Sequence, residues 1–259
     1  MGHIRLGVLP QSRKWRQVVA LLRSGADLSD VAQASALAAE RDLAKATSDP
    51  VFQYVAKLLV ELPLAARSPG FSEYLEGLGL SENALSSTPE LTAELSSAID
   101  RFAISVGTRS DLGEIAQMAL VESLSQKLDN SLPSLFAPEP REIRRELGKI
   151  SNGKEFAAFA RQFFASVTYK SLDYYLSREL ANHTGAGERF STDADRVAFE
   201  NALSSHTFEA SRIVEEFAGG WYGKTVWKNQ ELSETKIDNF ARYAFKKIRD
   251  ELGRRRQVA

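Results

Sequence analysis

The string Gly223-Lys224-Thr225 matches the end of a phosphate-binding loop. In such a loop, glycine N–H groups face the phosphates, the lysine reaches the outer phosphates, and the hydroxyl holds magnesium. The motif also needs a glycine five residues before Gly223, and Ala218 stands there. The preceding segment has helical character, whereas a phosphate-binding loop follows a buried strand. We therefore predict a helix that ends at Gly219 or Gly220 with a glycine cap, and a nucleotide-binding switch is the weakest alternative.

Arg178 and His183 have the spacing Arg-x-x-x-x-His near the end of a predicted helix. An imidazole can transfer a proton, and a guanidinium can stabilise negative charge on a phosphodiester. On a helical background this spacing resembles the signature of the HEPN ribonuclease family, in which the Arg and His act on RNA, usually across a dimer interface. The resemblance implies a ribonuclease with Arg178 and His183 as catalytic residues. The alternative is a surface arginine and a histidine that stabilises a helix C-terminus.

Basic residues gather at both ends of the chain, and residues 1–23 contain five basic and no acidic side chains. Arg and Lys pair with phosphates, and a Trp can stack on a base or anchor its segment to the core. The candidate nucleic-acid-binding residues are Arg13, Lys14, Trp15, Arg16, Arg254, Arg255 and Arg256. The alternatives are a solvated surface, a helix end stabilised by cations, or a surface that docks on an acidic partner or on the acidic middle of another copy.

The charge is uneven although the formal net charge is −1. Residues 24–136 contain seven basic and sixteen acidic side chains, and residues 137–259 contain twenty-one basic and eighteen acidic ones. Overall near-neutrality argues against a dedicated non-specific nucleic-acid binder. A local basic patch forms if the two ends meet in space.

The sequence offers little for metal or cofactor chemistry. The three histidines, His3, His183 and His206, are scattered and have no carboxylates at ligand spacing, and no cysteine is present. Disulfides, thiolate metal sites and a cysteine nucleophile are excluded. Phe156, Phe159 and Phe163 share one helical face and are typical of core rather than of a cofactor site. We expect no metal and no cofactor.

Almost every segment is predicted to be helical. Asp49-Pro50 and Thr88-Pro89 combine a capping residue with a proline, which is typical of helix starts, and Pro63 is expected to kink or end its helix. Extended structure is expected only in short pieces, residues 3–9 and 224–227. The sequence predicts an all-α bundle of about nine or ten helices. Three prolines between residues 129 and 140 suggest two helical lobes, 1–135 and 136–259, or one continuous domain.

Length and composition agree with a soluble globular protein. The chain has 259 residues, of which 43% are hydrophobic and 26% are charged. No apolar run approaches the length needed to span a bilayer, and the N-terminus lacks the pattern of a signal peptide. We expect a cytoplasmic protein without a membrane span.

Three strings, GHIRLGVLP, LPLAAR and FAGGWYGKT, resemble those of uncharacterised bacterial helical proteins encoded in mobile-element or phage-defence neighbourhoods. This resemblance implies an accessory or sensing subunit that works with a partner. Our main hypothesis is a non-enzymatic helical interaction protein that assembles with itself or with a partner protein. It contacts RNA or DNA through its basic ends, as a sensor or adaptor in a defence system.

Overall fold

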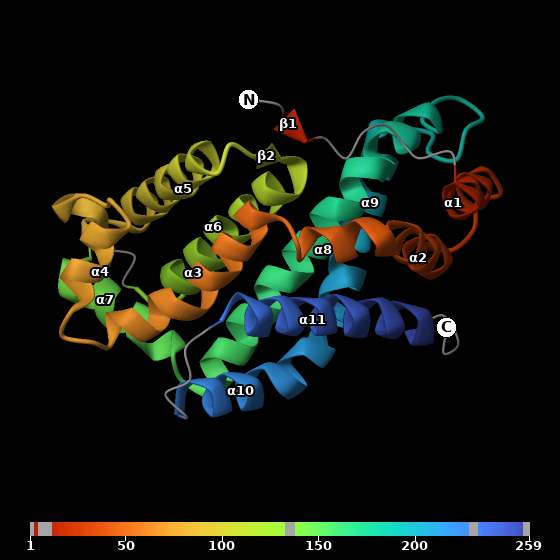
Figure 1. The fold of residues 1–259 in the computed structure, drawn as a ribbon. Helices are drawn as coiled ribbons and strands as arrows, with labels where there is room; N and C mark the ends of the chain where they lie inside the picture. Colours follow the sequence, from red (N-terminus) through yellow and green to blue (C-terminus); the bar gives the residue numbers. More distant parts are fainter. Residues whose placement is uncertain (1–2, 5–11, 133–137, 228–232, 256–259) are drawn as a thin grey trace.

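A computed structural model describes residues 3–4, 12–132, 138–227 and 233–255, and it confirms the all-α class. The described residues form eleven α-helices and one 3-10 turn, η1 (Figure 1). The elements of the N-terminal half are α1 Arg13–Arg23, α2 Leu28–Ala46, α3 Pro50–Ala66, α4 Phe71–Gly77, η1 Glu82–Leu85, α5 Thr88–Ser105 and α6 Asp111–Asp129. Those of the C-terminal half are α7 Pro140–Ile150, α8 Gly153–Asn182, α9 Asp193–Ala210, α10 Arg212–Trp227 and α11 Glu234–Arg255.

Extended structure is limited to one short pair of segments in the described part of the chain. Residues His3–Ile4 (β1) pair in parallel with Arg109–Ser110 (β2), so that His3 lies opposite Arg109. The expectation of an extended start is therefore confirmed for two residues, and residues 5–9 lie outside the described part. The extended segment expected at 224–227 is wrong, because these residues form the last turn of α10.

Several helices begin where the sequence predicts. The Asp49 carboxylate accepts a hydrogen bond from the Phe52 N–H at 2.9 Å, and the Ser110 hydroxyl oxygen accepts one from the Gly113 N–H at 2.9 Å. The same Ser110 hydroxyl donates to Asp49 at 2.6 Å, so that the caps of α3 and α6 bind each other. Pro63 does not end α3, which continues to Ala66, so the alternative in which it ends the helix is wrong.

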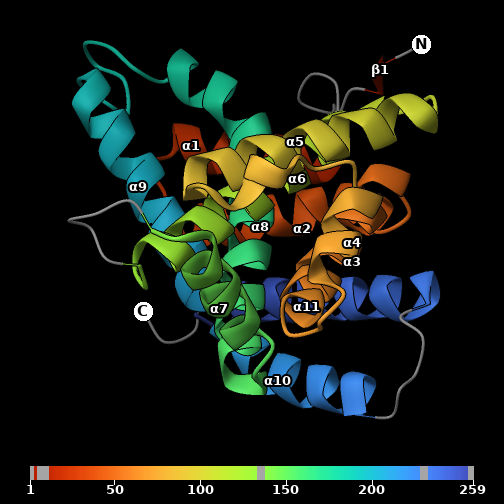
Figure 2. The ribbon, with the colours of Figure 1, turned by 90° about the vertical axis from the view of Figure 1, so that its left-hand side faces the viewer.

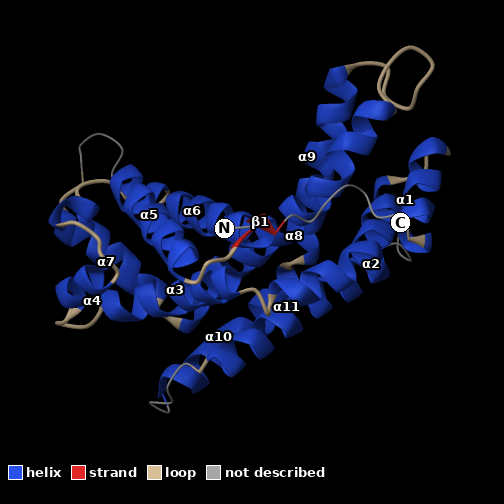
Figure 3. Ribbon diagram, turned by 45° about the horizontal axis from the view of Figure 1, so that its top comes forward, coloured by secondary structure: helices blue, strands red, loops and turns tan. Residues whose placement is uncertain are grey.

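Helix α8 is the central element, and α6, α9 and α10 pack along it (Figures 1 and 3). The buried apolar side chains form one contiguous cluster with residues from both sides of the predicted boundary near residue 135. Within it, Phe164 meets Phe240 and Phe245 of α11 edge-on, with ring centroids 5.5 and 5.3 Å apart. The core thus joins the end of the chain to its middle.

The two ends of the molecule are built from different helices. Helices α4, α5 and α7 lie together at one end, which faces the viewer in Figure 2. Helices α1 and α2 lie at the other end, and α11 runs towards them with its C-terminal turn (Figures 1 and 3).

The predicted glycine cap at Gly219 or Gly220 is wrong. Helix α10 runs through both residues, and neither has the positive φ of a left-handed cap. The chain breaks earlier, at Ser211, whose hydroxyl donates to the Phe208 carbonyl at 2.6 Å. Gly219 instead permits a close approach of α10 to α8, because a Cβ there would lie 2.6 Å from the carbonyl oxygen of Gly153. The glycines therefore serve helix packing.

Trp221 lies on the face of α10 that meets α11. Its ring stacks on Phe240 with centroids 4.0 Å apart and planes 15° apart, while the neighbouring Tyr222 stacks on Phe156 at 4.0 Å. This contact ties α10 to the last helix.

Candidate functional site: the basic face of helices α1, α2 and α11

The basic ends of the chain meet across α2. Helices α1 and α11 both pack against α2, and Glu40 of α2 is shared between them. One Glu40 oxygen, Oε2, lies 3.4 Å from Lys14 Nζ of α1, and the other, Oε1, accepts a hydrogen bond from the Arg249 guanidinium of α11. Gly253, near the end of α11, lies against the Gln33 side chain of α2. We call the surface of α1, α2 and α11 around Glu40 the basic face.

Trp15 anchors α1 to the core. Its side chain is 1% exposed, and its ring lies 4.8 Å from that of Tyr175 in α8. The Tyr175 hydroxyl in turn donates to Asp42 of α2 at 2.9 Å. The alternative in which Trp15 stacks on a base does not fit the structure, because its ring is covered by protein. The alternative expectation, an anchor, describes the observed contact.

Arg189 fixes the C-terminal end of α1 from the loop between α8 and α9. Its guanidinium donates to the carbonyl oxygens of Leu21, Leu22 and Ala26 at 3.3, 3.2 and 2.5 Å. It also lies over two aromatic rings, with centroids 5.4 Å away for Phe190 and 5.0 Å for Phe199. Burial lowers the pKa of Arg189, and the nearby carboxylate of Asp27 opposes this shift. The guanidinium adds a charged donor to the carbonyls at this helix end, where the Leu21 carbonyl also accepts from the Ala26 N–H and the Leu22 carbonyl from the Gly25 N–H.

The remaining predicted cations differ in what they contact. Arg13 and Arg16 are exposed and have no hydrogen-bond or ion-pair partner among the described residues. Arg254 is exposed and lies 3.7 Å from Glu251. Arg255 ends α11, but its side chain, like all of Arg256, lies outside the described part. The structure therefore leaves Arg13, Arg16 and Arg254 exposed on α1 and α11, whereas Lys14, alone of these four, has an ion-pair partner in α2 among the described residues.

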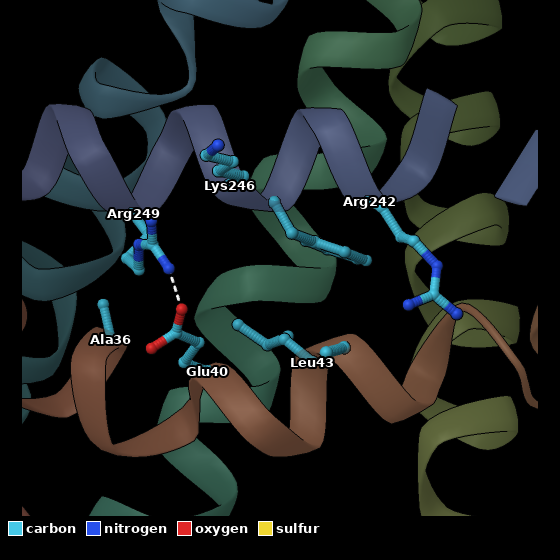
Figure 4. Close-up of a pocket in the computed structure, with 8 residues that line it drawn as sticks. Ala36, Glu40, Leu43, Arg242, Lys246 and Arg249 are labelled. Carbon is cyan, nitrogen blue, oxygen red and sulfur yellow. Dashed lines mark hydrogen bonds and ion pairs between the residues drawn. The ribbon is translucent and has the colours of Figure 1, made fainter. Parts of the chain in front are cut away.

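Three further cations of this face were not predicted from the sequence. Arg242, Lys246 and Arg249 of α11 occupy positions i, i+4 and i+7, which lie on one side of a helix. All three line a pocket between α11 and α2 (Figure 4). Their helical spacing is visible in the sequence, but the residues predicted from the sequence at this end of the chain are the three arginines at 254–256.

The pocket between α2 and α11 has a volume of about 190 Å³. Arg249 and Glu40 point towards each other across it, and Arg242 reaches to the end of α2, where it donates to the Ser48 hydroxyl at 2.9 Å (Figure 4). The residues that line it are Ala36, Glu40, Leu43, Ala44, Arg242, Phe245, Lys246 and Arg249. A second pocket, of about 210 Å³, lies between α1 and α2 and includes Lys14 and Asp30.

Charge is distributed unequally over the molecule. Helices α1, α2 and α11 contain thirteen basic and seven acidic residues, a formal net charge of +6. Residues 68–114, which include α4, η1 and α5, contain two basic and eight acidic residues, a net charge of −6. These segments lie at opposite ends of the molecule (Figures 1 and 2), so the positive charge of α1, α2 and α11 is separated from the negative charge of residues 68–114. Helix α9, which packs against α2 and α11, has one basic and four acidic residues.

Arg178 and His183 do not share a described cleft. Arg178 is exposed, whereas His183 is 7% exposed, caps α8, and has its Nδ1 atom 3.8 Å from a Glu188 carboxylate oxygen. Its Nε2 atom is buried without a hydrogen-bond partner. Five residues along a helix correspond to a rotation of about 140°, so the two side chains leave α8 in different directions. The ribonuclease alternative gains no support from this geometry.

Lys224 belongs to the helix α10 and is exposed. Backbone N–H groups inside a helix are bonded to carbonyls of the preceding turn, so they cannot surround a phosphate. The alternative of a nucleotide-binding switch at this string is therefore wrong in its structural premise.

Comparison of the chain with protein-family models, with curated proteins and with solved structures finds no match. Among the residues that the structure describes, no group of three or more His, Asp or Glu side chains is placed to hold a metal ion. Over the same residues, none of the helices combines the length and the apolar character that crossing a membrane requires.

Proposed function

We propose that this protein is a non-enzymatic helical interaction protein that binds the backbone of a nucleic acid through the basic face. The observation that carries the proposal is the meeting of the two basic ends across Glu40. Arg13 and Arg16 of α1 and Lys246 of α11 are exposed on the two helices that meet α2, without a partner among the described residues. Exposed cations of this kind can pair with phosphates without first breaking an internal contact.

The chemistry of this face favours contacts with phosphates over readout of bases. Neutralising phosphates with Arg and Lys releases bound counterions, and this contribution does not depend on sequence. Trp15, the aromatic residue of α1, is buried and offers no stacking surface. Binding that is sensitive to salt and insensitive to sequence is therefore expected, with RNA and DNA bound alike.

Assembly with itself or with a partner protein belongs to the same proposal. The acidic segment 68–114 lies far from the basic face, so a bound nucleic acid leaves it accessible. A role as sensor or adaptor subunit in bacterial defence rests on the sequence resemblance alone.

The test is fluorescence anisotropy with a labelled single-stranded oligonucleotide over a series of salt concentrations. A variant with Arg13→Glu, Lys14→Glu and Arg16→Glu is expected to lose at least about tenfold in affinity and to flatten the salt slope by about two to three. The matched control changes three exposed cations outside this face, Lys154→Glu, Arg212→Glu and Lys224→Glu, and adds the same charge. It is expected to retain most of the affinity.

Absence of binding by the wild-type protein at about 50 mM salt would remove nucleic acid from the proposal, because electrostatic binding is strongest at low salt. Equal losses in the two triple variants would show that net charge, rather than the basic face, governs binding. Gel analysis of RNA after incubation tests the ribonuclease alternative, and cleavage that His183→Ala removes would replace the proposal.

A further inference from the structure

The pocket between α2 and α11 combines an apolar floor with a charged rim. Phe245 is 5% exposed and Leu43 is 4% exposed, so their side chains form the wall between the helices and not an outer surface. Arg242, Lys246 and Arg249 lie along the α11 side, spaced over two helical turns (Figure 4). Glu40 is the one carboxylate among the residues that line this pocket.

The three cations differ in how far they are already engaged. Arg249 donates to Asp250 at 2.6 Å and to Glu40, and Arg242 donates to Asp238 at 2.8 Å and to Ser48. Lys246 has no partner among the described residues. An anion entering the pocket would therefore meet Lys246 first and would gain Arg249 by displacing Glu40.

Glu40 is suited to such a displacement because its two oxygens have different partners. Oε1 accepts from Arg249, while Oε2 lies 3.4 Å from Lys14. If Arg249 turns to another anion, the carboxylate keeps an ion pair with Lys14 and is not left unpaired. A buried carboxylate with a single partner would resist the exchange strongly, because an unpaired charge is costly.

We propose that this pocket binds a phosphate monoester that carries a small apolar or aromatic group. The phosphate lies between Lys246 and Arg249, in the place that Glu40 Oε1 now occupies, and the apolar group covers Leu43 and Phe245. The volume of about 190 Å³ is below the roughly 300 Å³ at which sites for drug-sized ligands begin, so a whole dinucleotide does not fit. A phosphate with one ring is of suitable size.

Two sources can supply this chemistry, a free phosphomonoester and the 5′-phosphorylated end of a nucleic-acid strand. The second source rests on the proposed function, because the pocket belongs to the basic face. In that case the terminal phosphate enters the pocket while the following phosphates contact α1.

The probe for the pocket itself is phenyl phosphate, compared with inorganic phosphate by calorimetric titration of the full chain. We expect phenyl phosphate to bind at least about threefold more tightly, because only its ring buries apolar surface. Glu40→Gln removes the competing carboxylate and is expected to raise the affinity for phenyl phosphate about fivefold. An increase in affinity on removing a residue is not the effect of general damage to the fold.

Lys246→Gln is expected to lower the affinity for phenyl phosphate about fivefold, since it removes the cation without a partner. The matched control is Lys247→Gln, which changes the neighbouring residue of α11. Lys247 lies over the Tyr243 ring with its Nζ 5.2 Å from the centroid, outside the pocket. The affinity of the Lys247→Gln variant for phenyl phosphate is expected to stay within about twofold of the wild type.

The proposal is overturned if Glu40→Gln does not tighten binding, if Lys246→Gln and Lys247→Gln weaken it equally, or if inorganic phosphate binds as well as phenyl phosphate. Oligonucleotides with a 5′-phosphate and with a 5′-hydroxyl group then identify the source. A preference for the 5′-phosphate that Lys246→Gln removes supports a strand end. If neither oligonucleotide binds but phenyl phosphate does, the proposed function fails and the pocket stands as a site for a free phosphomonoester.

Discussion

The acidic segment 68–114 and the basic face carry formal charges of equal size and opposite sign, but they use their charged side chains differently. In the acidic segment, Glu94 accepts hydrogen bonds from the Ser81 N–H at 2.8 Å and from the Ser81 hydroxyl. Arg101 donates to the carbonyl oxygens of Leu78 and Gly79 at 3.0 and 2.9 Å. These side chains hold the loop around η1. On the basic face, Lys14 and Arg249 share Glu40, while Arg13, Arg16 and Lys246 have no partner among the described residues.

Helix α7, which lies beside the acidic segment, extends this contrast. Arg144 donates to the carbonyl oxygens of Ala66 and Ser68 at 3.1 and 2.6 Å. Lys149 pairs at 2.8 Å with Glu146, which is 5% exposed. Cations are thus present at both ends, but those of α7 stabilise the fold. Net charge alone does not identify a binding surface, and the acidic segment also has exposed carboxylates without a partner among the described residues, Glu73, Glu76 and Glu90.

The contrast between the two ends requires that α1 keeps its position, and the buried ring of Trp15 anchors α1 to α8. Trp15→Ala is expected to lower the free energy of unfolding by about 3–5 kcal/mol, because it empties a fully buried site against Tyr175. Chemical denaturation monitored by circular dichroism measures this loss. Trp15→Phe keeps a ring and is expected to lose less. An unchanged stability of Trp15→Ala would mean that α1 is not anchored by this side chain.

Arg189 and Arg101 provide a matched pair, since each donates to the carbonyl oxygens at the end of a helix. Arg189, at the basic face, is partly buried and bonds three carbonyls, whereas Arg101, in the acidic segment, is exposed and bonds two. Arg189→Gln is expected to cost about 1.5–3 kcal/mol, since hydrogen bonds to charged groups are the stronger ones. Hydrogen exchange should also accelerate at the C-terminal turn of α1.

Arg101→Gln serves as the comparison for Arg189→Gln and is expected to cost about 1 kcal/mol or less, because its guanidinium can be replaced by water. Denaturation of both variants under the same conditions gives the difference. Equal losses would show that burial and the third carbonyl add nothing to the contribution of Arg189.

The parts of the fold that the sequence predicted correctly depend on local signals. Asp49-Pro50 starts α3 as expected, and the start expected at Thr88-Pro89 lies within one residue of the observed one. The role of Gly219 could not be predicted in this way, because it depends on Gly153 of α8, sixty-six residues earlier in the chain. A glycine that ends a helix and a glycine that lets a helix approach another look alike in one sequence.

The candidate site likewise has features that local sequence predicts and features that depend on tertiary contacts. Composition alone placed Arg13, Lys14 and Arg16 on a surface, and their exposure agrees with this. The burial of Trp15 depends on Tyr175, and the pocket at Arg242, Lys246 and Arg249 depends on α2 lying against α11. The spacing of Arg242, Lys246 and Arg249 places them on one side of α11, but only tertiary packing decides that this side faces Glu40.

The smallest expected effect is a pH dependence of local stability, which should be present in the acidic segment and absent from α1. The hydrogen bonds that Ser81 donates, first from its hydroxyl and then from its backbone N–H, hold the pKa of Glu94 below its ordinary value of 4.5. A carboxyl group whose pKa is lowered in the folded state contributes stability above its unfolded pKa, and this contribution disappears as the pH falls through the lower, folded value. Helix α1 itself contains no carboxylate, and its arginines do not titrate in this range.

Hydrogen exchange at the Ser81 N–H is therefore expected to accelerate as the pH falls from about 5 to about 3, after correction for intrinsic rates, while α1 keeps its protection. Glu94→Gln should remove this pH dependence, because the amide does not titrate, whereas Glu76→Gln, an exposed change in α4, should leave it intact. If α1 and the Ser81 loop lose protection together, the two ends unfold as one cooperative unit. The contrast between them would then be one of surface charge alone and not of local stability.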